Sequence, residues 1–294
     1  MDFGGTKIEA AAVDETGRFR ARVRGPNPGD YVTSLIAVRK LVEHVENVVG
    51  EKGTVGIGHP GSVSPVTGLL RNANSTWLNG KPFQEHLEAT LQRPVRLAND
   101  ADCLALSEAT DGAGAQDRVV FAAILGTGVG GGVVVDKQLI SGRNRIGGEW
   151  GHTPLPWAAN EEFPGPACWC GRLGCLETWI SGTGFQNDYA SDSGRTLKAE
   201  EIVERARKGE LEAENALSRY VDRLARGLAV VCDLIDPDVI VLGGGMSNVP
   251  EITDRLTDNI GARVFSDSFG TPVMPAKWGD SSGVRGAAWL WPLE

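Results

Sequence analysis

The sequence predicts an α/β fold that is duplicated internally, with a cleft between its two halves. Two observations carry this prediction. A glycine turn, an apolar strand and an acidic turn follow one another over residues 3–14, and the same order returns over residues 126–136. Strand-like and helix-like segments also alternate along both halves of the chain. Repetition of one pattern of this kind indicates two related halves.

The first half reads as strands interrupted by helices. Apolar residues recur at helical spacing over residues 34–49, which predicts an amphipathic helix. Asn99 stands where it can cap a second helix over residues 100–110. Short apolar or alternating segments predict strands at 6–13, 18–24, 54–58 and 94–97.

The second half repeats this scheme. A long apolar stripe predicts a helix over residues 213–235. Strands are predicted at 119–125, 133–135 and 238–242. The last of these strands leads through a glycine turn into a further helix. Each half therefore supplies the strands and helices of one α/β layer structure.

Small residues at 112–115 form the predicted hinge between the halves. We expect a small N-terminal domain at 1–112 and a larger domain at 113–282. The last residues, 283–294, are apolar enough to pack back onto the small domain.

Composition excludes several classes of protein. The chain of 294 residues has a formal net charge of −9 and no long basic run, so nucleic acid is not an expected partner. No apolar run approaches the roughly 18 residues of a membrane span, and no signal peptide opens the sequence. Together with reduced cysteines, these features predict a cytoplasmic protein without a membrane partner.

Three of the five cysteines cluster in one short segment, and one of the four histidines precedes them. Three thiolates and one imidazole are a ligand set that holds a structural zinc ion in a tetrahedron. A disulfide, or a buried histidine with scattered core thiols, are the alternatives, although a C-x-C pair is too short for an easy disulfide. The predicted ligands are His152, Cys168, Cys170 and Cys175. We expect Cys103 and Cys232 to be core thiols.

Three glycine-rich turns begin or follow strands, at 4–5, 126–132 and 243–245. Glycine lets successive backbone N–H groups approach an anion, so such turns can cradle phosphates. Tight hairpins use the same residues. Three such turns at strand ends in a duplicated fold nevertheless favour a nucleotide cleft, and the P-loop and dinucleotide-binding patterns do not occur.

Asp100 is the candidate catalytic base. It follows Asn99 at a predicted junction of strand and helix, and phosphoryl transfer to an alcohol needs a carboxylate that accepts the hydroxyl proton. The alternative is an acid that is favoured at a helix start by the helix dipole. Asp2, Thr6 and Lys7 would supply magnesium-water contacts and charge near the terminal phosphates.

Longer motifs together resemble the ROK family of repressors, open reading frames and kinases, over essentially the whole chain. These motifs are DFGGTK at 2–7, LANDA at 97–101, LGTGVGGG at 125–132, GEWGH at 148–152 and CWCGRLGCLE at 168–177. Other motifs are similar to the bacterial fructokinase (mannofructokinase) branch. They are NANSTWLNG at 72–80, ISGTGF at 180–185, LGGGMSN at 242–248 and GDSSGVRGAAW at 279–289.

The resemblance implies an actin-like (ribonuclease H-like) fold of two domains, with the sugar at the floor of a central cleft and ATP on the larger domain. It implies an ATP-dependent hexose kinase, a homodimer, that phosphorylates D-fructose at O6 and also accepts mannose. The implied cofactors are ATP, catalytic Mg²⁺ and structural Zn²⁺.

The family's site residues carry over to this chain one by one. Asp100 would be the catalytic base. The implied sugar contacts are Asn74, Asn99, Asp100, Glu149, His152 and Glu177. The implied nucleotide contacts are Asp2, Gly4, Gly5, Thr6, Lys7, Gly128, Val129, Gly130, Gly131 and Gly132, with Gly243, Gly244 and Gly245 near the nucleoside. The implied zinc ligands are the histidine and three cysteines already named.

Other functions remain as alternatives. Within the family these are kinases of glucose, mannose or N-acetylglucosamine. Fructose is favoured over N-acetylglucosamine because Trp77 and Trp150 would crowd an acetamido group. A repressor would carry a helix-turn-helix ahead of the glycine motif, which here begins at Asp2. A non-catalytic sugar-binding protein is opposed by Asp100 and by the phosphate-binding turns.

Three features depart from the fructokinase pattern. His59 replaces an apolar residue before Pro-Gly and would alter the wall that faces the sugar. Asp102 replaces a common asparagine, with little expected consequence. The strand that begins at Asp2 is short for a central strand, so we expect the natural chain to begin several residues upstream.

Overall fold

The computed structural model describes residues 1–292 of the chain. These residues form two compact units. The first unit comprises residues 1–115, 132–148 and the segment from Lys277 onward, and the second comprises residues 116–131 and 149–276. Residues 132–148 and 277–282 thus pack with the first unit, whereas the sequence places them in the larger domain. The domain boundary between residues 112 and 113 stays a prediction.

Both of these segments are tied to the end of helix α3 (Asp100–Thr110). The ammonium group of Lys277 donates a hydrogen bond of 3.0 Å to the carbonyl oxygen of Asp111. The ammonium group of Lys137 donates one of 2.6 Å to the carbonyl oxygen of Ala109. These contacts join residues that are distant in the sequence, which explains why local patterns do not reveal them.

The first unit contains a five-stranded sheet of order β3-β2-β1-β4-β7. Its strands are β1 (Asp2–Phe3), β2 (Lys7–Val13), β3 (Phe19–Pro26), β4 (Val55–His59) and β7 (Val95–Asn99). Strand β2 pairs antiparallel with β1 and β3, while β4 runs parallel to β1 and β7. All four strands predicted for this half are present. A small ribbon of β5 (Ser62–Val63) and β6 (Leu70–Arg71) lies outside this sheet.

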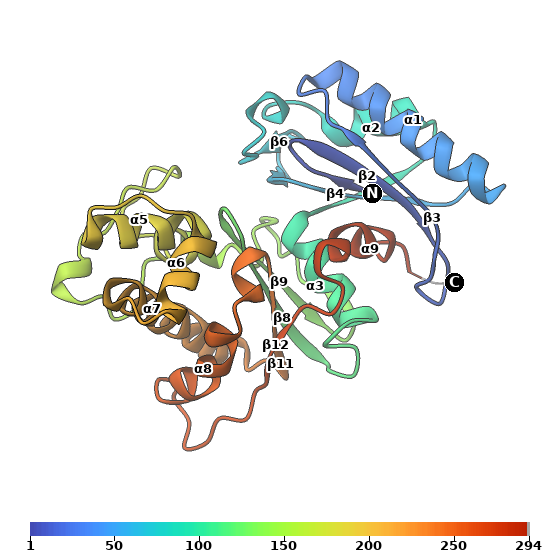
Figure 1. Cartoon of the computed structure of the whole chain (residues 1–294). Helices are drawn as coiled ribbons and strands as arrows, with labels where there is room; N and C mark the ends of the chain where they lie inside the picture. The colour runs from blue at the N-terminus through green and yellow to red at the C-terminus, as the bar shows by residue number, and fades with distance from the viewer. Residues whose placement is uncertain (293–294) are drawn as a thin grey trace. The chain divides into compact units, whose positions relative to one another are not determined.

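Helices of the first unit are α1 (Tyr31–Val49), α2 (Phe83–Leu91), α3 and α9 (Ser282–Ala288). The predicted apolar stripe of α1 is buried, and Asp30 caps this helix by accepting a 3.0 Å hydrogen bond from the backbone of Thr33. Helix α3 has the predicted bounds. Helices α3 and α9 pack side by side in Figure 1.

Two glycines allow α9 to pack this closely. A Cβ atom on Gly56 of β4 would overlap the carbonyl oxygen of Ala287. A Cβ atom on Gly286 would overlap the carbonyl oxygen of Cys103 in α3. Any larger residue at either position would push α9 away from its neighbours. Helix α9 thus packs directly against β4 and α3 of the first unit.

A second five-stranded sheet has the order β10-β9-β8-β11-β12. Its strands are β8 (Val119–Leu125), β9 (Val129–Val135), β10 (Gln138–Leu139), β11 (Val239–Gly243) and β12 (Val273–Pro275). Strand β11 runs parallel to β8 and β12, and all five of its residues are buried. This burial agrees with an apolar strand that is covered on both faces.

The helices of the second unit are α4 (Glu177–Ile180), α5 (Gly182–Ser193), α6 (Ala199–Arg207), α7 (Leu211–Ile235) and α8 (Pro250–Gly261). Helix α7 matches the predicted long helix and packs against α5, α6 and α8 (Figure 1). The helix expected after the glycines at 243–245 begins as one 3₁₀ turn and continues as α8 from Pro250. Within residues 1–292, every helix is too short or too polar to cross a membrane.

Candidate functional site

Asn99 and Asp100 lie at the start of α3 in the first unit. The side-chain oxygen of Asn99 accepts hydrogen bonds from the backbone of Ala101, at 2.7 Å, and of Asp102, at 3.1 Å. The helix therefore uses the oxygen of the Asn99 amide, and the amide nitrogen remains as its donor for a ligand. Asp100 is exposed, and its Oδ1 accepts a hydrogen bond of 2.8 Å from the same Ala101 N–H.

The first glycine turn joins β1 to β2. The backbone N–H of Gly4 donates to the carbonyl of Lys7 at 3.0 Å, which closes the turn. Asn27 holds the turn from the side, because its amide nitrogen donates to the carbonyl of Gly4 at 2.7 Å and its backbone donates to the carbonyl of Thr6 at 2.9 Å. Gly5, Thr6 and Lys7 are exposed and accessible to a ligand. The sequence does not predict the role of Asn27.

Asp2 lies just before this turn and is half-buried in β1. Its pKa is raised above the ordinary value, chiefly by burial, which disfavours the charged form of the carboxyl group. A cation in contact with this carboxylate would act in the opposite direction, because it favours the ionised form.

The second glycine turn is held by residues of α4 and α5. The carbonyl oxygens of Gly126 and Thr127 accept hydrogen bonds from Gly182 N–H, at 2.7 Å, and from Thr183 Oγ1, at 3.0 Å. A Cβ atom on Gly128 would lie 2.7 Å from a carboxylate oxygen of Glu177, so a larger residue there would displace this carboxylate. The second glycine turn and Glu177 are thus in direct contact.

Glu177 begins α4, and both of its carboxylate oxygens accept hydrogen bonds. The backbone N–H of Val129 donates to Oε2 at 2.9 Å, and the indole N–H of Trp169 donates to Oε1 at 2.7 Å. Glu149 is half-buried, and its carbonyl accepts a 3.3 Å hydrogen bond from the backbone of His152. The predicted contacts Glu149, His152 and Glu177 all belong to the second unit.

A histidine and three cysteines come together as a candidate metal centre. The ligand atoms of His152, Cys168, Cys170 and Cys175 all lie within 4.8 Å of one another. Two of the pairs are Cys168 Sγ to His152 Nδ1, at 3.6 Å, and Cys170 Sγ to Cys175 Sγ, also at 3.6 Å. Tetrahedral zinc with sulfur ligands at about 2.3 Å would separate two of them by roughly 3.7 Å. The four groups therefore fit one zinc ion.

Backbone hydrogen bonds shape the cysteine segment. The N–H of Cys168 donates to the carbonyl of Arg172 at 2.8 Å, and the N–H of Gly171 donates to the carbonyl of Cys168 at 3.0 Å. Gly171 has a φ of 87°, which favours glycine. Burial raises the pKa of Cys175 to about 12. A thiol must lose its proton to bind a metal, so metal binding here would release protons.

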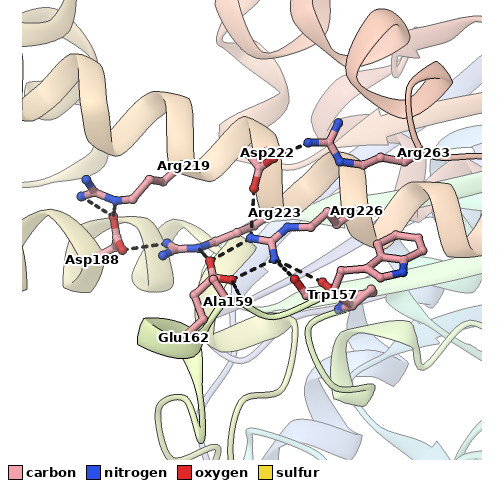
Figure 2. A network of polar contacts seen from close by, with 10 residues as sticks. Trp157, Ala159, Glu162, Asp188, Arg219, Asp222, Arg223, Arg226 and Arg263 are labelled. Carbon is pink, nitrogen blue, oxygen red and sulfur yellow. Dashed lines mark hydrogen bonds and ion pairs between the residues drawn. The ribbon is translucent and has the colours of Figure 1, made fainter.

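The segment between His152 and Cys168 is fastened to α7 by a buried ionic cluster (Figure 2). Glu162 accepts hydrogen bonds of 2.8 Å from Arg223 and from two nitrogens of Arg226. All three side chains are less than 10% exposed, at 8%, 5% and 7%. Burial would raise the pKa of Glu162, but the hydrogen bonds from Arg226 and Arg223 outweigh it and lower the pKa to about 2.

This cluster extends to helix α5 and along α7. Arg223 also donates to Asp188 of α5 at 2.7 Å, and Arg226 pairs with Asp222 at 3.0 Å (Figure 2). The sequence does not predict the cluster. Its only local signal is the pair of arginines three residues apart on a face of α7 that is otherwise apolar.

Other predicted residues lie elsewhere in the two units. Asn74 is exposed in the first unit. Gly244 follows β11 with a φ of 84°, and a Cβ atom there would lie 2.6 Å from the backbone of Leu125. His59 is buried at 2% exposure, packs edge-to-face on Phe83 and hydrogen-bonds the carbonyl of Pro60. The ring of His59 is therefore enclosed in the core, and an effect of His59 on the sugar-facing wall stays a prediction.

The two tryptophans that should crowd an acetamido group are also engaged in packing. Trp150 is 7% exposed, lies edge-on to Phe121 and donates to the carbonyl of Gly130 at 2.9 Å. Trp77 packs against Phe3 in the core of the first unit. The steric argument for fructose therefore loses its basis.

The two mixed sheets, their covering helices and the glycine turns define an actin-like α/β protein. The ROK family profile matches residues 1–294. The N-acetyl-D-glucosamine kinase of Salmonella typhimurium is 41% identical over 99% of this chain and 97% of its own length. That of Salmonella paratyphi C is also 41% identical, with the same coverage. This chain belongs to the ROK family.

Solved structures agree with this assignment. The ROK hexokinase of Thermus thermophilus is similar with a TM-score of 0.88 and 32% identity, over 98% of this chain and 95% of that one. The ROK glucokinase of Streptomyces griseus, solved with glucose and AMPPNP, has a TM-score of 0.78 and 27% identity, over 98% and 97%. The predicted actin-like fold is confirmed.

The expected fructokinase branch within the family is not confirmed. The sequence motifs favour a fructokinase, but the curated relatives with about 41% identity are N-acetyl-D-glucosamine kinases.

Proposed function

We propose that the protein is an N-acetyl-D-glucosamine kinase, which transfers the γ-phosphoryl group of ATP to the O6 hydroxyl of the sugar. The observation that carries this proposal is the 41% identity to kinases of this sugar over 99% of the chain. The coarser assignment, an ATP-dependent sugar kinase of the ROK family, rests on the family match and on the structural similarity to ROK hexokinases and glucokinases.

Asp100 would act as the general base. As the sugar oxygen attacks the γ-phosphorus, the bond to the leaving ADP oxygen breaks and the hydroxyl proton passes to the Asp100 carboxylate. The exposed position of Asp100 at the start of α3 supports this role. Its Oδ1 accepts a hydrogen bond of 2.8 Å from the Ala101 N–H, which helps to orient the carboxylate.

Donors and acceptors for sugar hydroxyls would come from the predicted contacts. Asn99 offers its amide nitrogen, because its oxygen caps α3. Glu177 offers the remaining lone pairs of a carboxylate that is already oriented by two N–H donors. Asn74, Glu149 and His152 complete the proposed sugar-binding set.

The glycine turns would bind ATP. Gly4, Gly5, Thr6 and Lys7, with residues 128–132, would contact the phosphates, and residues 243–245 would lie near the nucleoside. A magnesium ion bound with ATP would neutralise charge on the transferred group, and Asp2 is the carboxylate suited to its hydration shell.

His152, Cys168, Cys170 and Cys175 would hold a structural zinc ion. Two pairs of their ligand atoms lie 3.6 Å apart, which supports a tetrahedral ion. Zinc would fix the segment that carries Trp169 and leads into Glu177. We also propose a homodimer, as the family resemblance implies, and light scattering on a sizing column tests this assembly.

A hexose panel tests the function. ADP release is measured with N-acetylglucosamine, fructose, mannose and glucose under the same conditions. We expect kcat/KM for N-acetylglucosamine to exceed that for fructose by tenfold or more, about 1.4 kcal/mol of transition-state binding. A tenfold preference for fructose would instead support the alternative, a fructokinase that phosphorylates O6.

A further inference from the structure

Trp169 occupies an unusual place in the sequence and on the surface. It stands between two candidate metal ligands, Cys168 and Cys170, and its side chain is 63% exposed. A tryptophan with this exposure buries little apolar surface, so core packing does not explain its presence. Its contacts point to another role.

Two contacts connect Trp169 to both parts of the second-unit site. The indole ring lies edge-on to His152, with ring centroids 5.0 Å apart and an interplanar angle of 83°. The indole N–H donates a hydrogen bond of 2.7 Å to Oε1 of Glu177. One side chain thus touches a candidate metal ligand and a candidate sugar ligand.

These contacts fix the carboxylate of Glu177. The last torsion of a glutamate side chain is broad and roughly two-fold, so a free carboxylate rotates easily. Here Trp169 holds one oxygen and the backbone N–H of Val129 holds the other, at 2.9 Å. Each carboxylate oxygen has two acceptor sites. One site on each oxygen therefore remains for a sugar hydroxyl, in a fixed plane.

The backbone that carries the indole ring is held by hydrogen bonds of the cysteine segment. Hydrogen bonds from Cys168 to Arg172 and from Gly171 to Cys168 close this segment on both sides of Trp169. A metal ion bound by the flanking cysteines would hold the same backbone. A metal ion that restricts this backbone would therefore also restrict Glu177, through the side chain of Trp169.

We propose that Trp169 is a positioning residue that orients Glu177 for the sugar and links this orientation to the metal centre. This inference rests on the proposed function, in which Glu177 binds the sugar. Trp169 takes no part in proton transfer, so its loss affects binding of the sugar and leaves the chemical step intact.

Trp169→Phe tests the proposal. Phenylalanine keeps an aromatic ring beside His152 but removes the N–H donor to Glu177. We expect the KM and the calorimetric Kd for the sugar to rise about fivefold, with kcat within about twofold of the wild type. The KM for ATP and the zinc content, measured by elemental analysis, should not change.

Two further variants make the test specific. Trp169→Gln restores an N–H donor without the ring and should recover at least half of the lost sugar affinity. Trp157→Phe alters another tryptophan of the same region, 59% exposed, and should behave as the wild type. A wild-type sugar Kd in Trp169→Phe would overturn the proposal, as would equal losses for sugar and ATP.

Failure of the proposed function and failure of the role of Trp169 would give different experimental results. The hexose panel on the wild-type protein decides which sugar is the substrate, and the variants are then compared with that sugar. A different preferred hexose corrects the proposed substrate, whereas an unchanged Kd in Trp169→Phe refutes the role of Trp169.

Discussion

The side chains of Arg223 and Glu162 form a hydrogen bond of 2.8 Å, although 61 residues separate them along the chain. Both are buried, and Arg226 completes the cluster from the next turn of α7. A buried carboxylate is tolerated only while its partners remain, because loss of one partner leaves an uncompensated charge. The position of the segment between His152 and Cys168 therefore depends on Glu162.

Glu162→Gln should lower the free energy of unfolding by about 3 kcal/mol, because two buried guanidinium groups lose their carboxylate. Urea denaturation followed by circular dichroism measures this change. Glu161→Gln alters the exposed neighbour and should stay within about 0.5 kcal/mol of the wild type. Equal stabilities of the two variants would show that the cluster contributes nothing.

Asp100→Asn should lower kcat by about 10²- to 10⁴-fold, because the amide keeps the shape of the side chain but cannot accept the sugar proton. The sugar Kd should change only modestly. Steady-state kinetics and calorimetry separate the two quantities. Asp102→Asn, in the same helical turn, is the matched control with near-normal turnover. Near-normal turnover in Asp100→Asn would exclude Asp100 as the base.

Cys170→Ser should abolish zinc binding, and both stability and sugar affinity should fall with it, because the free energy of metal binding is part of the folding free energy of the segment. Elemental analysis and thermal melting measure the two effects. Cys232→Ala removes a buried thiol of α7 and should leave the zinc content unchanged. A wild-type protein purified without chelators that carries no zinc would contradict this prediction.

His59 should make stability depend on pH. Burial lowers the pKa of His59 from 6.5 to about 4, so the unfolded chain takes up a proton first as the pH falls. The contribution of His59 is therefore unchanged above pH 6.5 and decreases between pH 6.5 and 4, by up to about 3 kcal/mol.

Urea unfolding at pH 7 and at pH 4.5 measures this loss. His59→Phe keeps a ring against Phe83 and should lose less stability than the wild type on acidification. His44→Gln removes an exposed histidine of α1 and should follow the wild-type profile. A parallel pH profile for His59→Phe would remove His59 as the cause.

Local signals in the sequence predict the elements that depend on local interactions. The cap at Asn99 and the bounds of α3 follow from the residues themselves, and so do the strands on either side of the glycine turns. The grouping of the candidate metal ligands also follows from the sequence, because their spacing within one segment limits how they can meet.

The sequence does not predict contacts between residues that are far apart along the chain. The partner of Arg223 lies on a distant segment, and the packing of residues 132–148 onto the first unit depends on contacts such as Lys137 with Ala109. The orientation of Trp150 toward Phe121 has no local signal either. For this reason the choice of hexose, which depends on such orientations, is the weakest prediction from the sequence.

The close packing of α9 has a consequence for synthesis on the ribosome. Gly56 and Gly286 let this helix lie directly on β4 and α3, so it forms part of the interior of the first unit. The ribosome makes α9 only after the entire second unit. Translation of the first unit therefore begins before that of the second unit, but its interior is completed last. Until then the nascent chain exposes apolar surface that chaperones recognise.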